Sequence, residues 1–569
     1  MKSSNRRPGS ESHHPERAAR ARRIRRYAVP RAMIERATER RLAGDWRGAC
    51  AAANTDVALD LDAVRRERGA EFAEALLDDL HHLAPDLVRW HFPRYPAVDR
   101  TSVDSDVPVV LSRPGRDTGP WLVVLPLRHA IVAPQRLTLA LADDVYDALG
   151  VRPSRVRPRP RSWTAARYLW DARHVHETRE RWGGGPDRAP FLHPDGTPRA
   201  PDELPTADPG TGDPAARTEW IEGLHRAGRV TEAFAAAGIG MPEEEWTRTR
   251  RWMWTGVSPA RIALEAAHLF VSGAVPGDIG LHGRVRFVPG SAPGPPSMEP
   301  LPAKPADRAP AEVPWEFPPD VDAVLSGVSP DHLHPVVREA LAPARPPADG
   351  PVGPPPWEPL GPVRVRCGRE WHTVVLASGG PAIPHTEEER HREAALSALG
   401  GRSTGCFAVA TAWATGRGRL PKALRAHRAA LFEHILHGDA EAVLAYLDAG
   451  GDPHVRNGEG DSLLHHLTHV DHRVLLPRLL DAGLDIDDAP SPGDTPLNRA
   501  IRYDDTFPLV RALVAAGART DRIGTGWRAP TSLEALIRRN LEEKRYSVPG
   551  PWEDLLREPE SPSDHRKRT

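Results

Sequence analysis

Apolar residues recur every three or four positions through residues 71–91, with polar residues between them. This spacing predicts a helix with one buried face. The apolar stripe consists of Phe72, Leu76, Leu80, Leu83 and Leu87. Further helices are predicted within residues 31–53, 162–182, 215–238 and 258–272. The N-terminal half of the chain is therefore expected to be mainly helical.

Two segments follow a strand pattern instead. Between residues 107 and 141, short runs rich in valine and leucine flank a Pro-Gly turn, which predicts a small β element. Residues 363–377 alternate between polar and apolar and are divided by a turn at Gly368, which predicts a hairpin. Thr386 and Glu389 have the spacing of a capping box, so a helix is expected from about 386 to 399.

Proline divides the chain into parts. Of the 74 residues from 289 to 362, 22 are proline, a density that no core helix or central strand tolerates. We therefore predict a linker between two folded parts of a mainly α protein. The full expected division is a basic disordered arm (1–28), a mainly helical domain (29–288) with its β element near 107–141, the Pro-rich linker (289–362), a hairpin and helices that cap the next region (363–426), that C-terminal region itself (427–541) and a tail (542–569).

The overall charge is nearly balanced, with 76 basic and 77 acidic residues. This balance argues against nucleic acid as the main partner. The arm over residues 1–28 is the exception, because its basic residues could lie on phosphates, so weak nucleic-acid association through the arm stays an alternative.

Cysteine usage and hydropathy indicate a cellular compartment. The three cysteines, Cys50, Cys367 and Cys406, are odd in number and far apart, so we expect no disulfide framework and no CxxC metal pair. No apolar run reaches the roughly 18 residues that span a membrane. We expect a cytoplasmic protein that does not bind a membrane.

A sequence repeat occupies the C-terminal fifth. Asp448-Ala-Gly450 recurs as Asp481-Ala-Gly483 and as Ala515-Ala-Gly517, so the glycines are 33 and 34 residues apart. The lead-in at Ser462 recurs at Thr495 with the same 33-residue spacing. A TPL start and an LLxxG end at this period resemble the ankyrin repeat. The resemblance implies three units and a degenerate fourth, near residues 427–457, 460–489, 493–524 and 531–541.

The resemblance to ankyrin repeats also implies roles for individual residues. Structural motif positions would be Gly450, Gly483, Gly517, His465, Thr495, Pro496 and Leu497. The concave face and the turn tips, where ankyrin proteins bind partners, would carry His466, His469, Arg499, Arg502, Asp452, His454, Arg456, Asp485, Asp487, Arg519 and Asp521. The mixed charge of this set favours an unidentified protein partner. The expected function is a protein–protein interaction scaffold.

Other polar groupings give weaker chemical hypotheses. His465, His466, His469 and His472 have metal-like spacing, but no cysteine or carboxylate completes the set, so we expect structural roles. Cys367 and His372 could act as nucleophile and base across the hairpin, but no third orienting group is evident. We therefore expect no catalytic residues, no metal and no cofactor. An enzyme or effector in residues 29–288, targeted or restrained by the C-terminal repeats, stays the alternative. A pocket that joins His174, His176 and Glu177, or other convergent polar groups, would distinguish it.

Overall fold

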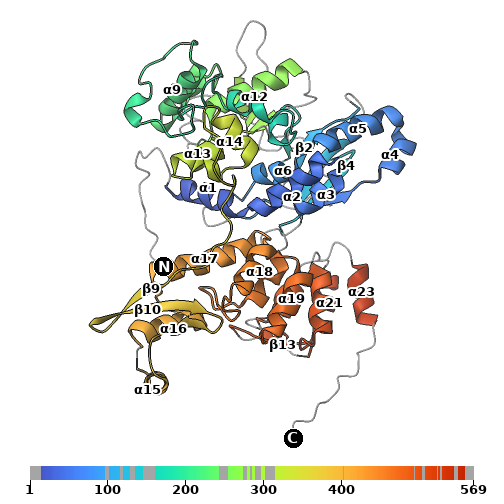
Figure 1. Ribbon diagram of the computed structural model, residues 1–569. Coiled ribbons are helices and arrows are strands. Elements are labelled where there is room, and N and C mark those ends of the chain that lie inside the picture. The colour runs from blue at the N-terminus through green and yellow to red at the C-terminus, as the bar shows by residue number, and fades with distance from the viewer. Residues whose placement is uncertain are drawn as a thin grey trace. The chain divides into compact units, whose positions relative to one another are not determined.

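The computed structural model divides the chain into two compact units (Figure 1). Unit 1 comprises residues 1–126 and 136–355, and unit 2 comprises residues 127–135 and 356–569. The structure describes residues 15–95, 101–115, 119–127, 135–144, 160–241, 254, 256–272, 279–281, 285–288, 297–300, 314–401, 403–491, 494–502, 506–521, 523–525, 528–543 and 549–557.

Unit 1 combines helices with two sheets. Its helices are α1 (Pro15–Tyr27), α2 (Arg31–Leu42), α3 (Trp46–Ala52), α4 (Leu61–Arg68), α5 (Ala70–His82), α6 (Pro85–His91), η1 (Arg167–Leu169), η2 (Val175–Glu177), α8 (Thr178–Arg181), η3 (Pro201–Glu203), α9 (Pro214–Arg226), α10 (Val230–Ala236), α12 (Pro259–Ser272), α13 (Pro319–Leu325), η5 (Pro330–His332) and α14 (Pro335–Leu341). Its strands are β1 (Thr55–Ala58), β2 (Val109–Ser112), β3 (Trp121–Pro126), β4 (Leu137–Ala142), β5 (Arg161–Ser162), β6 (Ile279–Leu281), β7 (Val285–Val288) and β8 (Ser297–Pro300).

The larger sheet of unit 1 has five strands in the order β1-β4-β3-β2-β5. The outer strands β1 and β5 pair parallel to their neighbours, and the three inner strands pair antiparallel. Strands β6, β7 and β8 form a second, antiparallel sheet. The expectation of a mainly α fold was therefore wrong. The two parallel edge strands are only four and two residues long, too short to show an alternating pattern in the sequence.

Helix α1 covers residues 15–27 of the segment that we expected to be a disordered arm; residues 1–14 lie outside the described residues. It packs against α13, and its apolar side chains Ile24 and Tyr27 are buried. Arg25 is also buried and forms an ion pair with Asp320 of α13. Arg25 therefore has a structural role in this basic segment, because a buried charge needs an opposite charge beside it.

Helices α13 and α14 lie in the segment that we expected to be a linker. Each begins with a proline in its first turn, where the missing N–H costs nothing. Val321 and Val337 are buried, so both helices belong to the core of unit 1. High proline content here marks helix starts as well as connections. The expected linker residues 289–296 and 301–313 lie outside the described residues.

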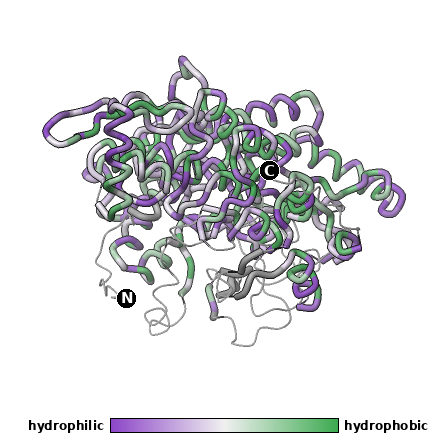
Figure 2. Tube along the Cα trace, turned by 90° about the horizontal axis from the view of Figure 1, so that it is seen from below, coloured by the Kyte–Doolittle hydropathy of each residue, from purple (hydrophilic) through white to green (hydrophobic). Residues whose placement is uncertain are grey.

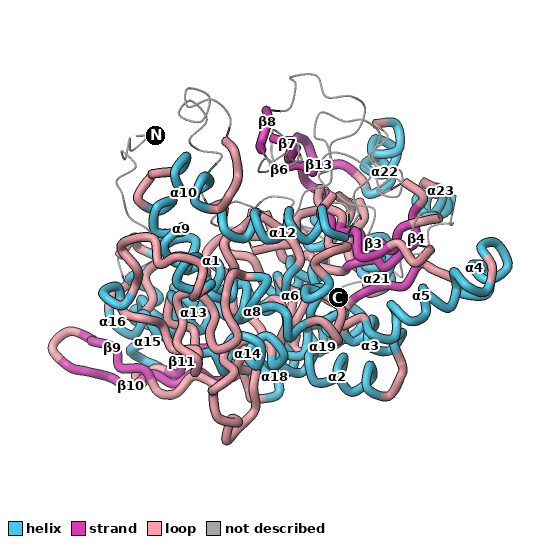
Figure 3. The backbone as a smooth tube through the Cα atoms, turned by 90° about the horizontal axis from the view of Figure 1, so that it is seen from above, coloured by secondary structure: helices cyan, strands magenta, loops and turns pink. Residues whose placement is uncertain are grey.

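Unit 2 contains a small sheet and a set of helices. The strands β9 (Val363–Cys367), β10 (Glu370–Ala377) and β11 (Gly380–Ala382) form an antiparallel sheet in the order β11-β10-β9. Figure 3 shows β9 and β10 running side by side to an outer turn. The remaining elements are α15 (Glu387–Ala398), α16 (Gly405–Thr415), α17 (Lys422–Leu436), α18 (Ala440–Asp448), η6 (Leu463–His469), α19 (His472–Asp481), α20 (Pro496–Ala500), α21 (Phe507–Ala515), β12 (Ile523–Thr525), β13 (Arg528–Thr531), α22 (Leu533–Glu542) and α23 (Gly550–Arg557).

The repeated glycines of unit 2 mark helix ends. Gly450, Gly483 and Gly517 have positive φ and follow α18, α19 and α21. Glycine takes this left-handed position at the ends of helices in many folds. The intervening elements are unequal, because η6 is a 3₁₀ helix and a two-stranded sheet follows α21. The regular α-solenoid that we expected over residues 427–541 was therefore wrong.

Each helix in the described part of the chain is too short or too polar to cross a membrane. Figure 2 shows hydrophilic and hydrophobic residues interspersed along the trace.

Candidate metal centre

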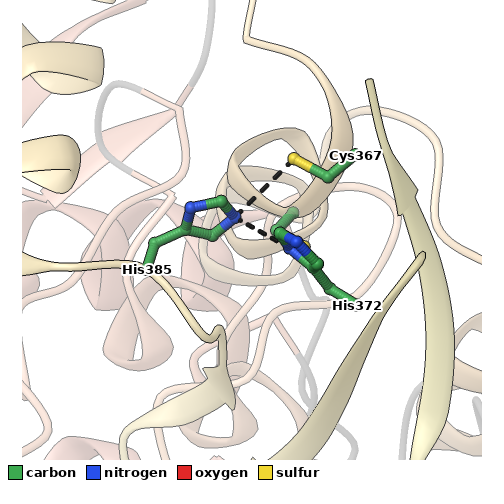
Figure 4. A group of neighbouring side chains, drawn as sticks. Cys367, His372 and His385 are labelled. Atoms are coloured by element: carbon green, nitrogen blue, oxygen red, sulfur yellow. Dashed lines mark hydrogen bonds between the residues drawn. The ribbon is translucent and has the colours of Figure 1, made fainter. Parts of the chain in front are cut away.

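Four metal-ligating side chains of unit 2 converge on one point. Cys367 ends β9, His372 lies in β10, His385 precedes α15, and Cys406 is the second residue of α16. Their donor atoms all lie within 4.8 Å of one another. Figure 4 shows Cys367, His372 and His385 directed toward one another from three segments of the chain. In the part of the chain that the structure describes, this is the one such grouping of histidine, cysteine and carboxylate donors.

The spacing of the donor atoms matches a tetrahedral site. Nδ1 of His372 lies 3.2 Å from Nε2 of His385. Sγ of Cys367 lies 3.6 Å from Nε2 of His385, and Sγ of Cys406 lies 3.5 Å from Nδ1 of His372. With zinc bonds of about 2.3 Å to sulfur and about 2.0 Å to nitrogen, a tetrahedron requires about 3.3 Å between nitrogens and about 3.5 Å between sulfur and nitrogen. These three donor-atom distances therefore match the edges of one tetrahedral zinc site.

The strand alternation and the turn place two of these ligands. Gly368 has φ +65°, which glycine adopts easily, and the turn pairs Cys367 with Glu370 across the hairpin. Alternate residues of a strand point to opposite faces, so His372 shares a face with the buried Val374. The ligands thus lie on the inner face of the hairpin, toward α16.

Gly405 allows the close approach of the other ligands. It begins α16 with φ +57°, and a Cβ added there would lie 2.6 Å from Sγ of Cys367. Any other residue at this position would therefore push the sulfur of Cys367 out of place. The absence of a side chain at Gly405 leaves room for Cys367 beside Cys406.

Each ligand histidine has a carboxylate on its other ring nitrogen. Glu389 Oε2 lies 3.3 Å from Nδ1 of His385, and Glu370 Oε2 lies 3.6 Å from Nε2 of His372. Such carboxylates fix the tautomer and the orientation of metal-binding histidines. The backbone N–H of Thr386 also donates to Glu389, and this bond together with His385 holds the pKa of Glu389 below its ordinary value.

A bound cation would favour the charged form of the two sulfurs. Burial and the neighbouring Cys367 raise the pKa of the Cys406 thiol to about 11, because two close thiolates repel each other. A divalent cation bound between the sulfurs stabilises both thiolates. Cys406 is fully buried, and the ring of Phe407 packs on His385 with 4.5 Å between centroids. The donor set is complete and largely covered, as in structural zinc sites.

The residues expected to bind a partner through a concave face differ widely in their exposure to solvent. Asp452, His466 and His469 are buried. Asp452 accepts a hydrogen bond from Nε1 of Trp413, and Arg499 forms ion pairs with Asp461 and Asp494. Arg456, Asp487 and Arg499 are half-buried, and His454, Asp485, Arg502, Arg519 and Asp521 are exposed. The buried members hold unit 2 together, so this set does not form one exposed surface.

The expected motif residues have local structural contacts. One ring nitrogen of His465 lies 2.9 Å from the hydroxyl of Ser462, and the other lies 3.0 Å from the carbonyl oxygen of Asp494. Thr495 caps α20 by accepting from the N–H of Asn498, and Pro496 and Leu497 are buried in its first turn.

The alternative enzyme pocket is not assembled in unit 1. Nδ1 of His174 lies 2.6 Å from Glu177, but His176 is exposed on the neighbouring 3₁₀ helix and takes no part in that pair. The structure therefore does not bring these three side chains together.

The sequence indicated only half of the metal centre. It placed Cys367 and His372 on a hairpin but suggested a nucleophile and a base, and it did not connect them with His385 and Cys406. Successive ligands are separated by 4, 12 and 20 intervening residues. None of these matches the short paired spacings that are typical of a zinc site. The available signal was that two of the three cysteines bracket three histidines, His372, His385 and His391, within 40 residues.

Comparison of the chain with protein-family models, with curated proteins and with solved structures gives no match. The resemblance of residues 427–541 to ankyrin repeats was therefore wrong: it rested on helix-ending glycines and leucine pairs, which recur wherever helices of similar length follow one another.

Proposed function

We propose that unit 2 binds one zinc ion through Cys367, His372, His385 and Cys406, and that the ion has a structural role. The observation that carries the proposal is the match between the donor spacings of 3.2, 3.5 and 3.6 Å and a tetrahedral zinc site. Two thiolates and two imidazoles favour zinc over magnesium or calcium, which take oxygen ligands. All four positions are filled by the protein, so no position is left for a substrate.

The proposed ion would add to the apolar contact between the hairpin and α16, where Val365, Val374 and Val409 belong to one hydrophobic core. The sheet β11-β10-β9 buries Val365 and Val374, while most of its other side chains are exposed or half-buried. Small sheets with so little apolar burial are marginally stable alone. The ion would tie the hairpin, the segment before α15 and the start of α16 to one point.

Zinc titration of the full chain tests this proposal. We expect one zinc ion per chain by native mass spectrometry, and cobalt bound at the same site should give the visible absorption of a tetrahedral sulfur–nitrogen complex. Gly405→Ala should weaken zinc binding roughly tenfold, an effect of about 1.4 kcal/mol, because the new Cβ displaces Sγ of Cys367.

Gly400→Ala is the matched control. Gly400 also has positive φ, but a Cβ there meets nothing within 4 Å. Its zinc affinity should stay near that of the wild type. Zinc binding that is absent from the wild type, or equal in the two alanine variants, would contradict the proposed site.

A second candidate function is protein binding, now through α15 instead of a concave face. Leu396 lies in the last turn of α15 and Leu399 directly follows the helix; their side chains are 51% and 86% exposed. Exposed leucines this close together are typical of a helix that docks in a groove of a partner. Figure 1 shows α15 at the margin of unit 2, beyond α16.

Affinity capture from a lysate of the source organism tests this candidate. The double variant Leu396→Glu/Leu399→Glu should lose a protein that the wild type retains, because the charges cannot enter an apolar groove. Val474→Glu is the control, since Val474 is also a partly exposed apolar residue of unit 2 (46%). Identical captured proteins in all three samples would exclude α15 as the binding element.

A further inference from the structure

The hairpin formed by β9 and β10 has two chemically different faces. Strand alternation places Cys367, His372 and Val374 on the inner face, toward the metal centre. The outer face carries Arg364, Arg366, Trp371, Thr373 and Val375, and all five side chains are exposed. The same alternation that builds the metal centre therefore creates a second, solvent-facing surface.

This outer face combines an aromatic ring with positive charge. Trp371 is 57% exposed, which is unusual for the largest apolar side chain on a small sheet. Arg366 is its direct cross-strand neighbour, and the guanidinium of Arg364 lies 5.1 Å from the centre of its ring. The acidic residue of the hairpin, Glu370, is directed to His372 of the inner face instead.

The general richness of this chain in arginine does not account for that arrangement. Arginine bias explains the residue type. It does not explain why both arginines share the outer face of the hairpin with the exposed tryptophan while the carboxylate lies on the inner face. Arg369, in the turn between the strands, adds a third exposed positive charge at the tip.

We propose that the outer face of this hairpin binds single-stranded nucleic acid. Trp371 would stack on one unpaired base, and Arg364 and Arg366 would contact the flanking phosphates. Exposed aromatic rings beside basic side chains are the usual means of binding single strands without sequence preference. A duplex hides the flat faces of its bases, so an exposed tryptophan ring on this face fits an unpaired strand better than a double helix.

This surface differs from the basic N-terminal segment in what it offers a ligand. The N-terminal segment supplies charge alone, whereas the hairpin also supplies a stacking platform. The proposal concerns the outer face and does not depend on which ion the inner face binds.

Fluorescence anisotropy with a labelled 15-nucleotide oligothymidine tests the proposal on the full chain, over a series of salt concentrations. Wild-type binding should weaken steeply with salt. Arg364→Gln/Arg366→Gln should reduce the slope of log affinity against log salt by about 1.4, because about 0.7 counterion is released per phosphate contact in a single strand. Trp371→Ala should lower the affinity about tenfold without changing that slope, because stacking is not ionic.

The control variant is Arg473→Gln/Arg538→Gln, which removes two exposed arginines elsewhere in unit 2; its affinity should equal that of the wild type. Unchanged hydrogen exchange of β9 and β10 in every variant shows that the hairpin is intact. Equal affinity of the hairpin variants and the wild type would overturn the proposal and point to the N-terminal segment. Loss of polyglutamate binding in the hairpin variants, with oligothymidine binding unchanged, would also overturn it, in favour of an acidic protein.

Discussion

Cys406→Ser is expected to lower zinc affinity by roughly two orders of magnitude and to loosen residues 363–415 without affecting unit 1. Structural zinc contributes about 10–16 kcal/mol of apparent binding energy in small zinc domains, so each of four ligands accounts for about 3 kcal/mol. The hydroxyl of serine is a poor ligand for zinc, and the buried Cys406 joins α16 to the hairpin. Hydrogen exchange should show faster exchange in β9, β10 and the start of α16. A chelator added to the wild type should produce the same pattern.

Cys50→Ser provides the control for this prediction. Cys50 is equally buried but lies in α3 of unit 1, away from the donor group. The substitution makes the same chemical change and should leave zinc content and exchange in residues 363–415 unaltered. Full zinc affinity in Cys406→Ser, or the same loss in Cys50→Ser, would remove Cys406 from the metal centre.

Asp320→Ala is expected to destabilise unit 1 by about 3–5 kcal/mol, because it leaves a buried positive charge without its partner. Asp320 is fully buried, its Oδ1 lies 2.6 Å from Nε of Arg25, and the same oxygen accepts a 2.8 Å hydrogen bond from Trp90. Burial alone would raise the pKa of Asp320, but Arg25 and the hydrogen bond from His91 hold it below its ordinary value.

Chemical denaturation monitored on unit 1 measures this loss. Because the folded pKa of Asp320 is depressed, its contribution is present at neutral pH and is lost as the pH falls below about 4 through the folded pKa. Replacing both partners, Arg25→Met with Asp320→Leu, should recover part of the stability, since both charges of the pair are removed while the indole N–H of Trp90 loses its acceptor. Asp202→Ala, at an exposed position, should change stability by less than about 0.5 kcal/mol. An equal effect of Asp320→Ala and Asp202→Ala would show that the ion pair does not stabilise unit 1.

Local patterns predicted local features of this fold. Alternation located the hairpin of β9 and β10, and the capping box of Thr386 and Glu389 located the start of α15. These features depend on residues close in sequence, which a single sequence displays. The carboxylate of Glu389 also faces His385, but nothing in a capping box reveals that second contact.

The remaining features depend on contacts between distant residues. Arg25 and Asp320 are 295 residues apart, and each alone resembles an ordinary surface charge. Cys406 reaches Cys367 only because α16 folds back onto the hairpin and Gly405 lacks a side chain. The 33-residue period led to the wrong prediction of a solenoid for a related reason. The repeated glycines indicate where helices end, but they do not indicate how the helices pack.

The pairing of α1 with α13 affects the order in which unit 1 can fold during synthesis. At about 5–20 residues per second, a ribosome takes about 15 to 60 s to progress from Arg25 to Asp320. Throughout that interval Arg25 and the indole N–H of Trp90 lack the carboxylate that they contact in the finished protein. The core of unit 1 is therefore completed only after most of its chain has been made. The helices that are synthesised first stay incompletely packed until then, in a state that a chaperone can recognise.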